Sequence, residues 1–500
     1  MKRTALGVLG ALTVLAAGCS LLPKKNIQDA VAPAPHEPWT PPPAARMPEE
    51  PAHASAPDIP AEYTKPGATL SLGQLVDVAL RNNPQTREAW HVARAAAAEV
   101  GTKRAQYFPY VDALGTLERQ KQSAVGGQFT YLQTTYGPAI AATWLLFDFG
   151  AREADVQETT RFLYAADWSH NAAIQNVVLD VARAYYGYLN SKAQVVARRA
   201  SLDEARRNLE AAEERHRAGV ATIADVLQAK TSASQAELDL QEVEGQVQII
   251  RGALATAVGV PANLPVDVGE LPEDLPLDAV KKNVDELIAR AVSERPDLAA
   301  ERYRALAAES HIRVAARDGL PSLTVDATGN RTFYHQPGAP DPFSTNWAGL
   351  ISLRIPVFHG FETAYQVAQA KEEASAARAS AAIVENQVIL DVWSSYYAMQ
   401  TAGQRVRTTR DLLASATQSA DVAQGRYRAG VGSILDLLTA QSALAEARSE
   451  EARARSSWFL AVADLAHATG VLQPGSPEIR SMPAVTGAAA APSPKGTPTP

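Results

Sequence analysis

The sequence is poor in the residues that build disulfides, metal centres and catalytic sites. Cys19 is the only cysteine among 500 residues, so the chain cannot form an internal disulfide. Only four methionines are present, which argues against a methionine-lined path for copper. The nine histidines are scattered without a His-x-x-x-His pair, and no phosphate loop or dinucleotide fingerprint occurs. We therefore expect no metal, no cofactor and no enzymatic activity.

The sequence also lacks an excess of positive charge and a long apolar segment. Its net charge of −7 disfavours nucleic acid, which selects basic surfaces. After the N-terminal region, no apolar run is long enough to form a transmembrane helix. If the body crosses a membrane, it must do so as a closed β-barrel, because only helices and barrels satisfy the backbone there.

The N-terminus has the features of a secretory signal. A basic start and an uncharged apolar run at 5–17 precede small residues and the lone cysteine. This end resembles the bacterial lipobox, in which the thiol is acylated, although Ala16 stands where leucine is usual. Ser20 fits sorting to the outer membrane. We expect a signal peptide at 1–18 and a lipid on Cys19; a plain signal peptide that happens to end in cysteine is the alternative.

The body of the chain is internally duplicated. VVLDVARAYY at 177–186 recurs as VILDVWSSYY at 388–397, a shift of 211 residues. RAGV at 217–220 recurs at 428–431 with the same shift. Units of this size are too large for a solenoid, so we expect two copies of one large unit. The predicted organisation is a Pro/Ala-rich tether at 19–68, a first repeat at 69–270, a second at 271–471 and a disordered Pro/Ala-rich tail at 472–500.

Each copy predicts the same order of elements. A helix interrupted by proline comes first, then two strands, then two long helices joined by a tight turn. The first long helix contains no proline and would extend about 95 Å. Good helix formers fill these segments, and an extended coiled bundle would stabilise them. The predicted helices are, in the first copy, 71–106 and 152–216, and, in the second, 284–317 and 362–427.

The strand segments alternate between apolar and polar residues. In the first copy, Ile140, Ala142 and Trp144 would share one apolar face of a strand. In the second copy, Trp347 and Ile351 would share the apolar face of another strand. Such alternation suits a wall with lipid on one side and a polar lumen on the other, or a soluble hairpin packed on a helix. Four strands are too few to close a membrane barrel, so a barrel would require several chains.

The turns between the long helices match in the two copies. Gly219 and Gly430 can adopt the left-handed conformation that ends a helix. Thr222 and Ser433 can cap the following helix, with an aspartate three residues later as in a capping box. A tight helix–helix turn explains these residues locally; a docking surface at the hairpin tip is the functional alternative.

Together these features resemble the TolC-like outer membrane factor family, in particular its lipoprotein branch found with multidrug efflux pumps. The resemblance covers about 70–471. It rests on the duplication, the RAGV tips, and the strand-to-helix segments WLLFDFG at 144–150 and IPVFHG at 355–360. His359 stands where the family usually has aspartate.

The resemblance implies an α+β fold, mostly α, with long coiled helical hairpins. Three chains with four strands each would form a twelve-stranded β-barrel, continued by a periplasmic α-helical tunnel. The partners implied are two further copies, a periplasmic adaptor protein, an inner-membrane pump and outer-membrane lipid. The adaptor would meet the tips, at Gly219, Val220, Thr222, Gly430, Val431 and Ser433. Leu435 and Asp436 would lie at the constriction of the channel, with Asp436 as a helix-start acid the alternative.

The function implied is that of an outer-membrane channel subunit in a tripartite efflux system. It would be a passive exit duct for small molecules, lipid-anchored in the outer membrane and extending into the periplasm. An exit duct for type I protein secretion is the alternative within the channel class. A non-conducting, lipid-anchored periplasmic coiled-coil spacer is the alternative from another class, but such a spacer would not need two alternating strand pairs.

Overall fold

The computed structural model describes residues 58–60, 63, 69–124, 128–272, 275–277, 283–335 and 341–472. The chain divides into two compact units, Met1–Pro57 and Asp58–Pro500. The first unit lies outside the described residues, and so do residues 473–500. The expectations for the signal peptide, Cys19 and the C-terminal tail fall there.

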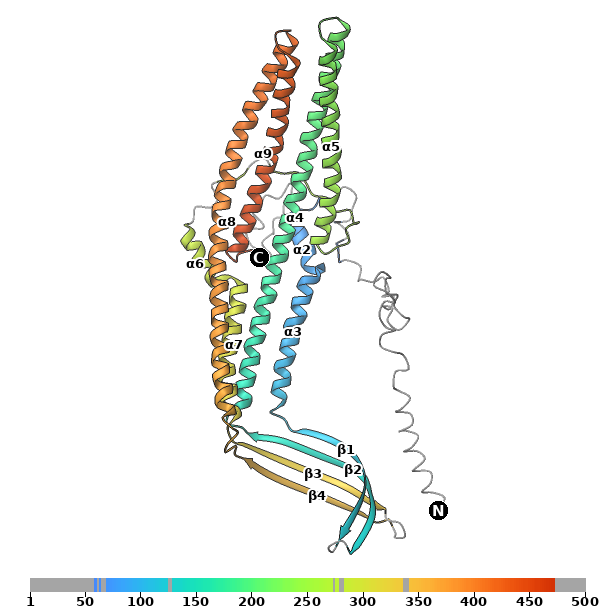
Figure 1. Ribbon diagram of the computed structural model, residues 1–500, viewed down its shortest axis with the longest axis vertical. Helices are drawn as coiled ribbons and strands as arrows, with labels where there is room; N and C mark the ends of the chain where they lie inside the picture. The colour runs from blue at the N-terminus through green and yellow to red at the C-terminus, as the bar shows by residue number, and fades with distance from the viewer. Residues whose placement is uncertain are drawn as a thin grey trace, which may run out of the picture. The chain divides into compact units, whose positions relative to one another are not determined.

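The second unit has the same order of elements twice (Figure 1). In the first half these are α2 (Leu72–Asn82), α3 (Pro84–Ala105), β1 (Tyr110–Ala124), β2 (Phe129–Phe147), α4 (Ala151–Arg217) and α5 (Ile223–Ala257). In the second half they are α6 (Val284–Glu294), α7 (Pro296–Asp318), β3 (Ser322–His335), β4 (Phe343–Arg354), α8 (Glu362–Arg428) and α9 (Ile434–Ala468). The helices and strands predicted from the sequence are confirmed.

The first helix of each half is divided at its proline. Asn83 ends α2 in an extended conformation and its side chain caps α3 by accepting a hydrogen bond from the amide of Gln85. Pro84 and Pro296 occupy the first turns of α3 and α7, where a missing N–H leaves no intrahelical bond unmade. Arg295 holds the place of Asn83 but makes no cap hydrogen bond.

The two long hairpins, α4–α5 and α8–α9, contact each other mainly through α4 and α9, with a smaller contact between α5 and α9. Each pairs a helix of 67 residues with one of 35. Three side chains donate to backbone carbonyls across the contact between the halves: Gln175 to Gly470, Gln194 to Ser449 and Ser456 to Tyr186. The ring of Tyr186 also stacks on that of Phe459 at 4.9 Å between centroids. The two halves are thus joined by buried contacts that are not repeated at the equivalent positions of the duplication.

The strands form one four-stranded antiparallel sheet in the order β1-β2-β3-β4. The register aligns Ala113, Ile140, Gly329 and Trp347 in one row, and Leu117, Tyr136, Phe333 and Phe343 in another. β1 and β4 are the two edges of the sheet. None of the described helices crosses a membrane, since none is both long and apolar enough.

The register separates the sheet into an apolar and a polar face. The apolar face carries Ile140, Trp144, Val325, Trp347 and Ile351, as the alternation predicts. The polar face carries Thr143 and Asp326, which are joined by a hydrogen bond of 2.8 Å. No described helix packs extensively against either face, so these strands are not a hairpin packed on a helix of the same chain.

Candidate functional site

The tip of each long hairpin is a glycine turn of the same construction. Gly219 and Gly430 have φ of +73° and +77°, the left-handed region that ends a helix. The amide of Val220 donates to the carbonyl of Arg215 at 2.9 Å, and the amide of Val431 donates to that of Arg426 at 3.0 Å. No neighbouring atom lies within 4 Å of a Cβ built on Gly219, so glycine is required there by φ and not by crowding.

Both helices that leave the tips begin with a capping box. Thr222 accepts from the amide of Asp225, whose carboxylate accepts from the amide of Thr222 at 2.8 Å. Ser433 and Asp436 form the same pair, with a longer amide-to-carboxylate distance of 3.4 Å. The predicted caps are therefore present, and Asp436 is the helix-start acid. Its role at a constriction concerns neighbouring copies and stays a prediction.

The residues predicted to dock a partner face outward. Val220 and Val431 are both exposed at their side chains, and so is Leu435 in the first turn of α9. Exposed apolar residues on short, fixed turns suit a protein contact. Docking at these residues stays a prediction, and so does the constriction at Leu435.

One contact between the tips has no signal in the sequence. Arg215 of α4 donates from Nη1 to the carbonyl of Tyr427 on α8 at 2.9 Å, and its guanidinium lies 4.7 Å from the centre of the Tyr427 ring. Burial raises the pKa of the Tyr427 hydroxyl. The position equivalent to Arg215 is Arg426 and that equivalent to Tyr427 is His216, at the same 211-residue shift. The contact joins the two halves, so the repeat could not signal it.

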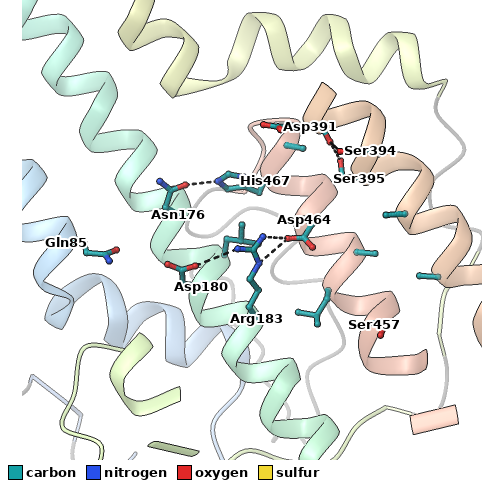
Figure 2. Close-up of a pocket in the computed structure, with 16 residues that line it drawn as sticks. Gln85, Asn176, Asp180, Arg183, Asp391, Ser394, Ser395, Ser457, Asp464 and His467 are labelled. Carbon is teal, nitrogen blue, oxygen red and sulfur yellow. Dashed lines mark hydrogen bonds and ion pairs between the residues drawn. The ribbon is translucent and has the colours of Figure 1, made fainter. Parts of the chain in front are cut away.

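A polar cavity of about 920 Å³ lies where the halves meet, at the C-terminal end of α9 (Figure 2). Arg183 of α4 pairs with Asp464 of α9 at 2.8 Å, and His467 bonds to Oδ1 of Asn176 at 2.9 Å. Burial lowers the pKa of His467, and the positive charge of Arg295 lowers it further. His467 is therefore a neutral hydrogen-bond donor in this contact.

The buried guanidinium of Arg295 lies beside this cavity. It pairs with Asp297 at 2.5 Å and with Asp391 of α8 at 2.7 Å. Burial alone would raise the pKa of Asp297, but the hydrogen bonds and charge of Arg295 outweigh it and hold that pKa below its ordinary value. The cavity thus has satisfied ion pairs on its walls, which suits a structural joint. Among the described residues, no three His, Cys, Asp or Glu side chains converge as metal ligands would.

A family model describing outer membrane efflux proteins matches this chain twice, at residues 75–260 and 287–471. The chain belongs to the outer membrane efflux protein family. The two matches cover one half each of the described fold. Members of this family are efflux channels and the family is not one of enzymes.

Curated relatives agree with this membership. Protein CyaE of Bordetella pertussis is 26% identical over 76% of this chain and 79% of its own length. Outer membrane protein OprJ of Pseudomonas aeruginosa is 26% identical over 74% of this chain and 78% of its own.

Two solved structures show the same fold. A crystal structure of a membrane protein from Pseudomonas aeruginosa has a TM-score of 0.72 at 23% identity, covering 82% of this chain and 98% of that one. The outer membrane protein VceC of Vibrio cholerae has a TM-score of 0.68 at 22% identity, over 80% and 96% of the two chains. By its family and its curated relatives, this efflux protein is a channel component of the outer membrane that extends into the periplasm.

Proposed function

We propose that three copies of this efflux protein form one exit duct of a tripartite system, anchored in the outer membrane by lipid on Cys19. Each copy supplies four strands to a twelve-stranded barrel, and the long helices continue the duct into the periplasm. A periplasmic adaptor binds the hairpin tips and connects the duct to an inner-membrane pump.

The four-stranded sheet is the observation that carries this proposal. One of its faces is apolar, with Trp347 and Ile351 largely exposed. β1 and β4 leave backbone groups at the two edges of the sheet without a partner strand among the described residues. Pairing β4 of one copy with β1 of the next satisfies both edges, and lipid covers the apolar face.

The unequal covering of α4 and α8 supports the association of several copies. Second-half helices α7 and α9 pack on α4, whereas no first-half helix packs extensively on α8. Leu179 and Tyr186 of α4 are 5% and 3% exposed, but the equivalent Leu390 and Tyr397 of α8 are 55% and 44% exposed. Helices α3 and α5 of a second copy, placed on α8 as α7 and α9 lie on α4, would cover these side chains.

The cargo we propose is small molecules. Among the relatives, one from Pseudomonas putida is named for antibiotic efflux and another from the same species for pyoverdine export. A type I protein-secretion duct is the other channel candidate, and it would use the same sheet and tips. A non-conducting coiled-coil spacer is disfavoured, because a spacer has no use for an uncovered sheet with one apolar face.

Single-channel conductance of the purified full chain, measured beside its oligomer mass, tests the duct. We expect trimers that insert into a planar bilayer and conduct. If Asp436 also narrows the channel, Asp436→Ala raises the closed-state conductance; an unchanged conductance leaves Asp436 as a helix cap only. Monomers that never insert would exclude the duct and favour the spacer.

The adaptor contact is tested at Val431, whose exposed side chain contributes little to folding. Val431→Glu places a charge on an exposed turn, so we expect trimers of normal mass and conductance but impaired export of drugs from cells. Val431→Ile keeps the apolar surface and is the matched control. Normal drug resistance with the glutamate variant would rule out docking at this residue.

The lipid anchor has a direct test. Cys19→Ser removes the thiol, so labelled fatty acid should no longer be incorporated into the protein. Persistent labelling would place the lipid on another residue and refute acylation of Cys19.

A further inference from the structure

The charged residues of the sheet are divided between its two faces. All three acidic residues of the described strands, Asp112, Glu118 and Asp326, lie on the polar face. Three of the four Lys and Arg residues lie on the apolar face instead, and these are Arg119, Lys121 and Arg331. Arg354 is the one basic strand residue on the polar face. A charge on a lipid-facing surface is costly near the middle of a bilayer and much less so near its interfaces.

The register places two of these basic residues, Arg119 and Lys121, at one end of the apolar face. Arg119 lies opposite Thr134, and Lys121 opposite Leu132, towards the hairpin ends of the strands and away from the helices. The next row towards the helices is Leu117, Tyr136, Phe333 and Phe343, which is mostly aromatic. The rings of Tyr136 and Phe333 stack at 5.3 Å between centroids.

The side chain of Arg331 reaches this aromatic row. Arg331 lies opposite Thr345, one row nearer the helices than Phe333 and Phe343. Its guanidinium nevertheless lies 4.2 Å from the centre of the Phe343 ring and 5.6 Å from that of Phe333. The side chain therefore runs towards the hairpin end, as basic residues do when they extend from an apolar surface to a polar boundary.

The length of the apolar band agrees with this boundary. Leu323 and Phe333 on β3 are ten residues apart, about 33 Å along the strand. At the tilt of about 40° that membrane strands have, this distance corresponds to a height of about 25 Å, the thickness of the apolar band of an outer-membrane barrel. The aromatic row thus lies at the headgroup level of the leaflet farther from the helices, and Arg119 and Lys121 lie just beyond it.

We propose that Arg119, Lys121 and Arg331 form a binding site for the phosphate groups of anionic lipid in the outer leaflet. This inference rests on the proposed function, since it requires the apolar face of the sheet to contact lipid. Among the described strand residues no acid shares this face. Outside the strands, the described acid nearest to Arg331 in sequence is Asp341, which precedes β4 and accepts a hydrogen bond from Nδ1 of His335 at 2.7 Å. The three cations can therefore attract an anionic headgroup. Arginine over an aromatic ring keeps its donors available to phosphate, which it can bind with two parallel hydrogen bonds. The site would bind lipid around the channel and determine how deeply the channel lies in the membrane.

Native mass spectrometry of the full chain in a neutral detergent tests the site. The protein is titrated with diphosphorylated lipid A and, separately, with lipid A from which both phosphates have been removed. We expect the wild-type protein to prefer the phosphorylated lipid by at least tenfold. A triple variant, Arg119→Gln with Lys121→Gln and Arg331→Gln, should lose this preference. Each charge removed should lower the affinity for the phosphorylated lipid about fivefold.

Arg354→Gln is the matched control, because it removes one positive charge from the same sheet on its polar face. It should retain the preference, whereas Arg331→Gln alone should reduce it about fivefold. Equal binding of the two lipids by the wild-type protein, or an unchanged preference in the triple variant, would overturn the site. Conductance of the triple variant in a neutral bilayer separates the two ideas: trimers that conduct normally without lipid preference retain the duct and exclude the site.

Discussion

The two halves of this efflux protein have the same backbone but different surroundings. Their long helices have equal lengths, both tips have a left-handed glycine, and both following helices start with a capping box. Yet α4 is packed by helices of both halves, whereas α8 is packed extensively only by the described helices of its own half. Duplication therefore determines the local structure of each half, namely its helix lengths, turns and caps. The packing around a long helix depends instead on which helices of the other half lie beside it.

The strand-to-helix junctions show the same divergence in their side chains. In the first half, Asp148 accepts from the backbone amide and the Nε of Arg152, at 2.8 and 3.0 Å. Arg152 also donates to the carbonyls of Gln106, Leu145 and Leu146. The equivalent residues of the second half are His359 and Thr363, so this buried ion pair has no counterpart there. Both junctions still contain two consecutive residues with positive φ, at 149–150 and 360–361.

The largest effect is expected where the comparison between α4 and α8 is tested directly. Replacing both Leu390 and Tyr397 with glutamate puts charge where a second copy would cover α8. Losing two apolar contacts and desolvating the new charges would weaken each interface by about 5 kcal/mol, enough to dissociate the oligomer. Light scattering should show a smaller mass, with helical circular dichroism retained. Leu390→Met with Tyr397→Phe should leave the mass unchanged, and an intact oligomer in the glutamate variant would contradict this role for α8.

The next effect concerns two equivalent glycines that end α5 and α9. A Cβ on Gly259 would lie 2.7 Å from the backbone of Asn83, and φ there is +82°; on Gly470 the nearest atom, in the backbone of Arg295, is at 3.2 Å. Left-handed strain and overpacking together predict a loss of about 4 kcal/mol for Gly259→Ala. Gly470→Ala should lose about half as much. Urea unfolding measures both, and equal losses would show that strain at φ, not crowding, decides the cost.

The junctions provide a third comparison. Asp148→Asn leaves the buried guanidinium of Arg152 without its carboxylate, and we expect a loss of about 3 kcal/mol in the free energy of unfolding. His359→Asn changes an exposed side chain and should alter stability by about 0.5 kcal/mol or less. Thermal unfolding followed by circular dichroism distinguishes them. Similar shifts for the two variants would mean that the ion pair is not what holds the first junction.

Much of this fold could be predicted from the sequence because it is local. Proline at Pro84 and Pro296 divides the first helices, and the glycine turns with their capping residues end and start the long ones. Strand alternation predicts which face is apolar. All these signals act within a few residues of chain, so no knowledge of the tertiary fold is needed to interpret them.

The contacts between the halves could not be predicted in this way. The bond from Arg215 to the Tyr427 carbonyl and that from Gln194 to the Ser449 carbonyl join residues more than 200 positions apart. Neither is repeated at the equivalent positions, so the duplication gives no signal for them. The position of the basic residues on the apolar face could not be predicted either. Arg119 and Arg331 become neighbours of the aromatic row only through the register of the sheet.

The smallest effect is a pH dependence at the contact between the halves. Burial and the charge of Arg295 lower the pKa of His467 in the folded state, so the unfolded chain binds a proton there more readily. Stability is therefore complete above the ordinary histidine pKa of about 6.5 and declines as the pH falls below it towards the folded-state value. The equivalent position in the first half is Thr256, which cannot contribute such a term.

Two variants sharpen this last comparison. His467→Gln keeps a donor for the Asn176 carbonyl oxygen, at 2.9 Å in the wild-type protein, but cannot be protonated, so the decline below pH of about 6.5 should become smaller. Asn176→Asp places a carboxylate beside the ring and raises the folded-state pKa of His467, so this group should then gain stability as the pH falls. Urea unfolding between about pH 5 and 8 avoids the ordinary titration of carboxylates. If the free energies of unfolding of the wild-type protein and His467→Gln decline in parallel over this range, His467 does not cause the pH dependence, because only its titration distinguishes the two proteins.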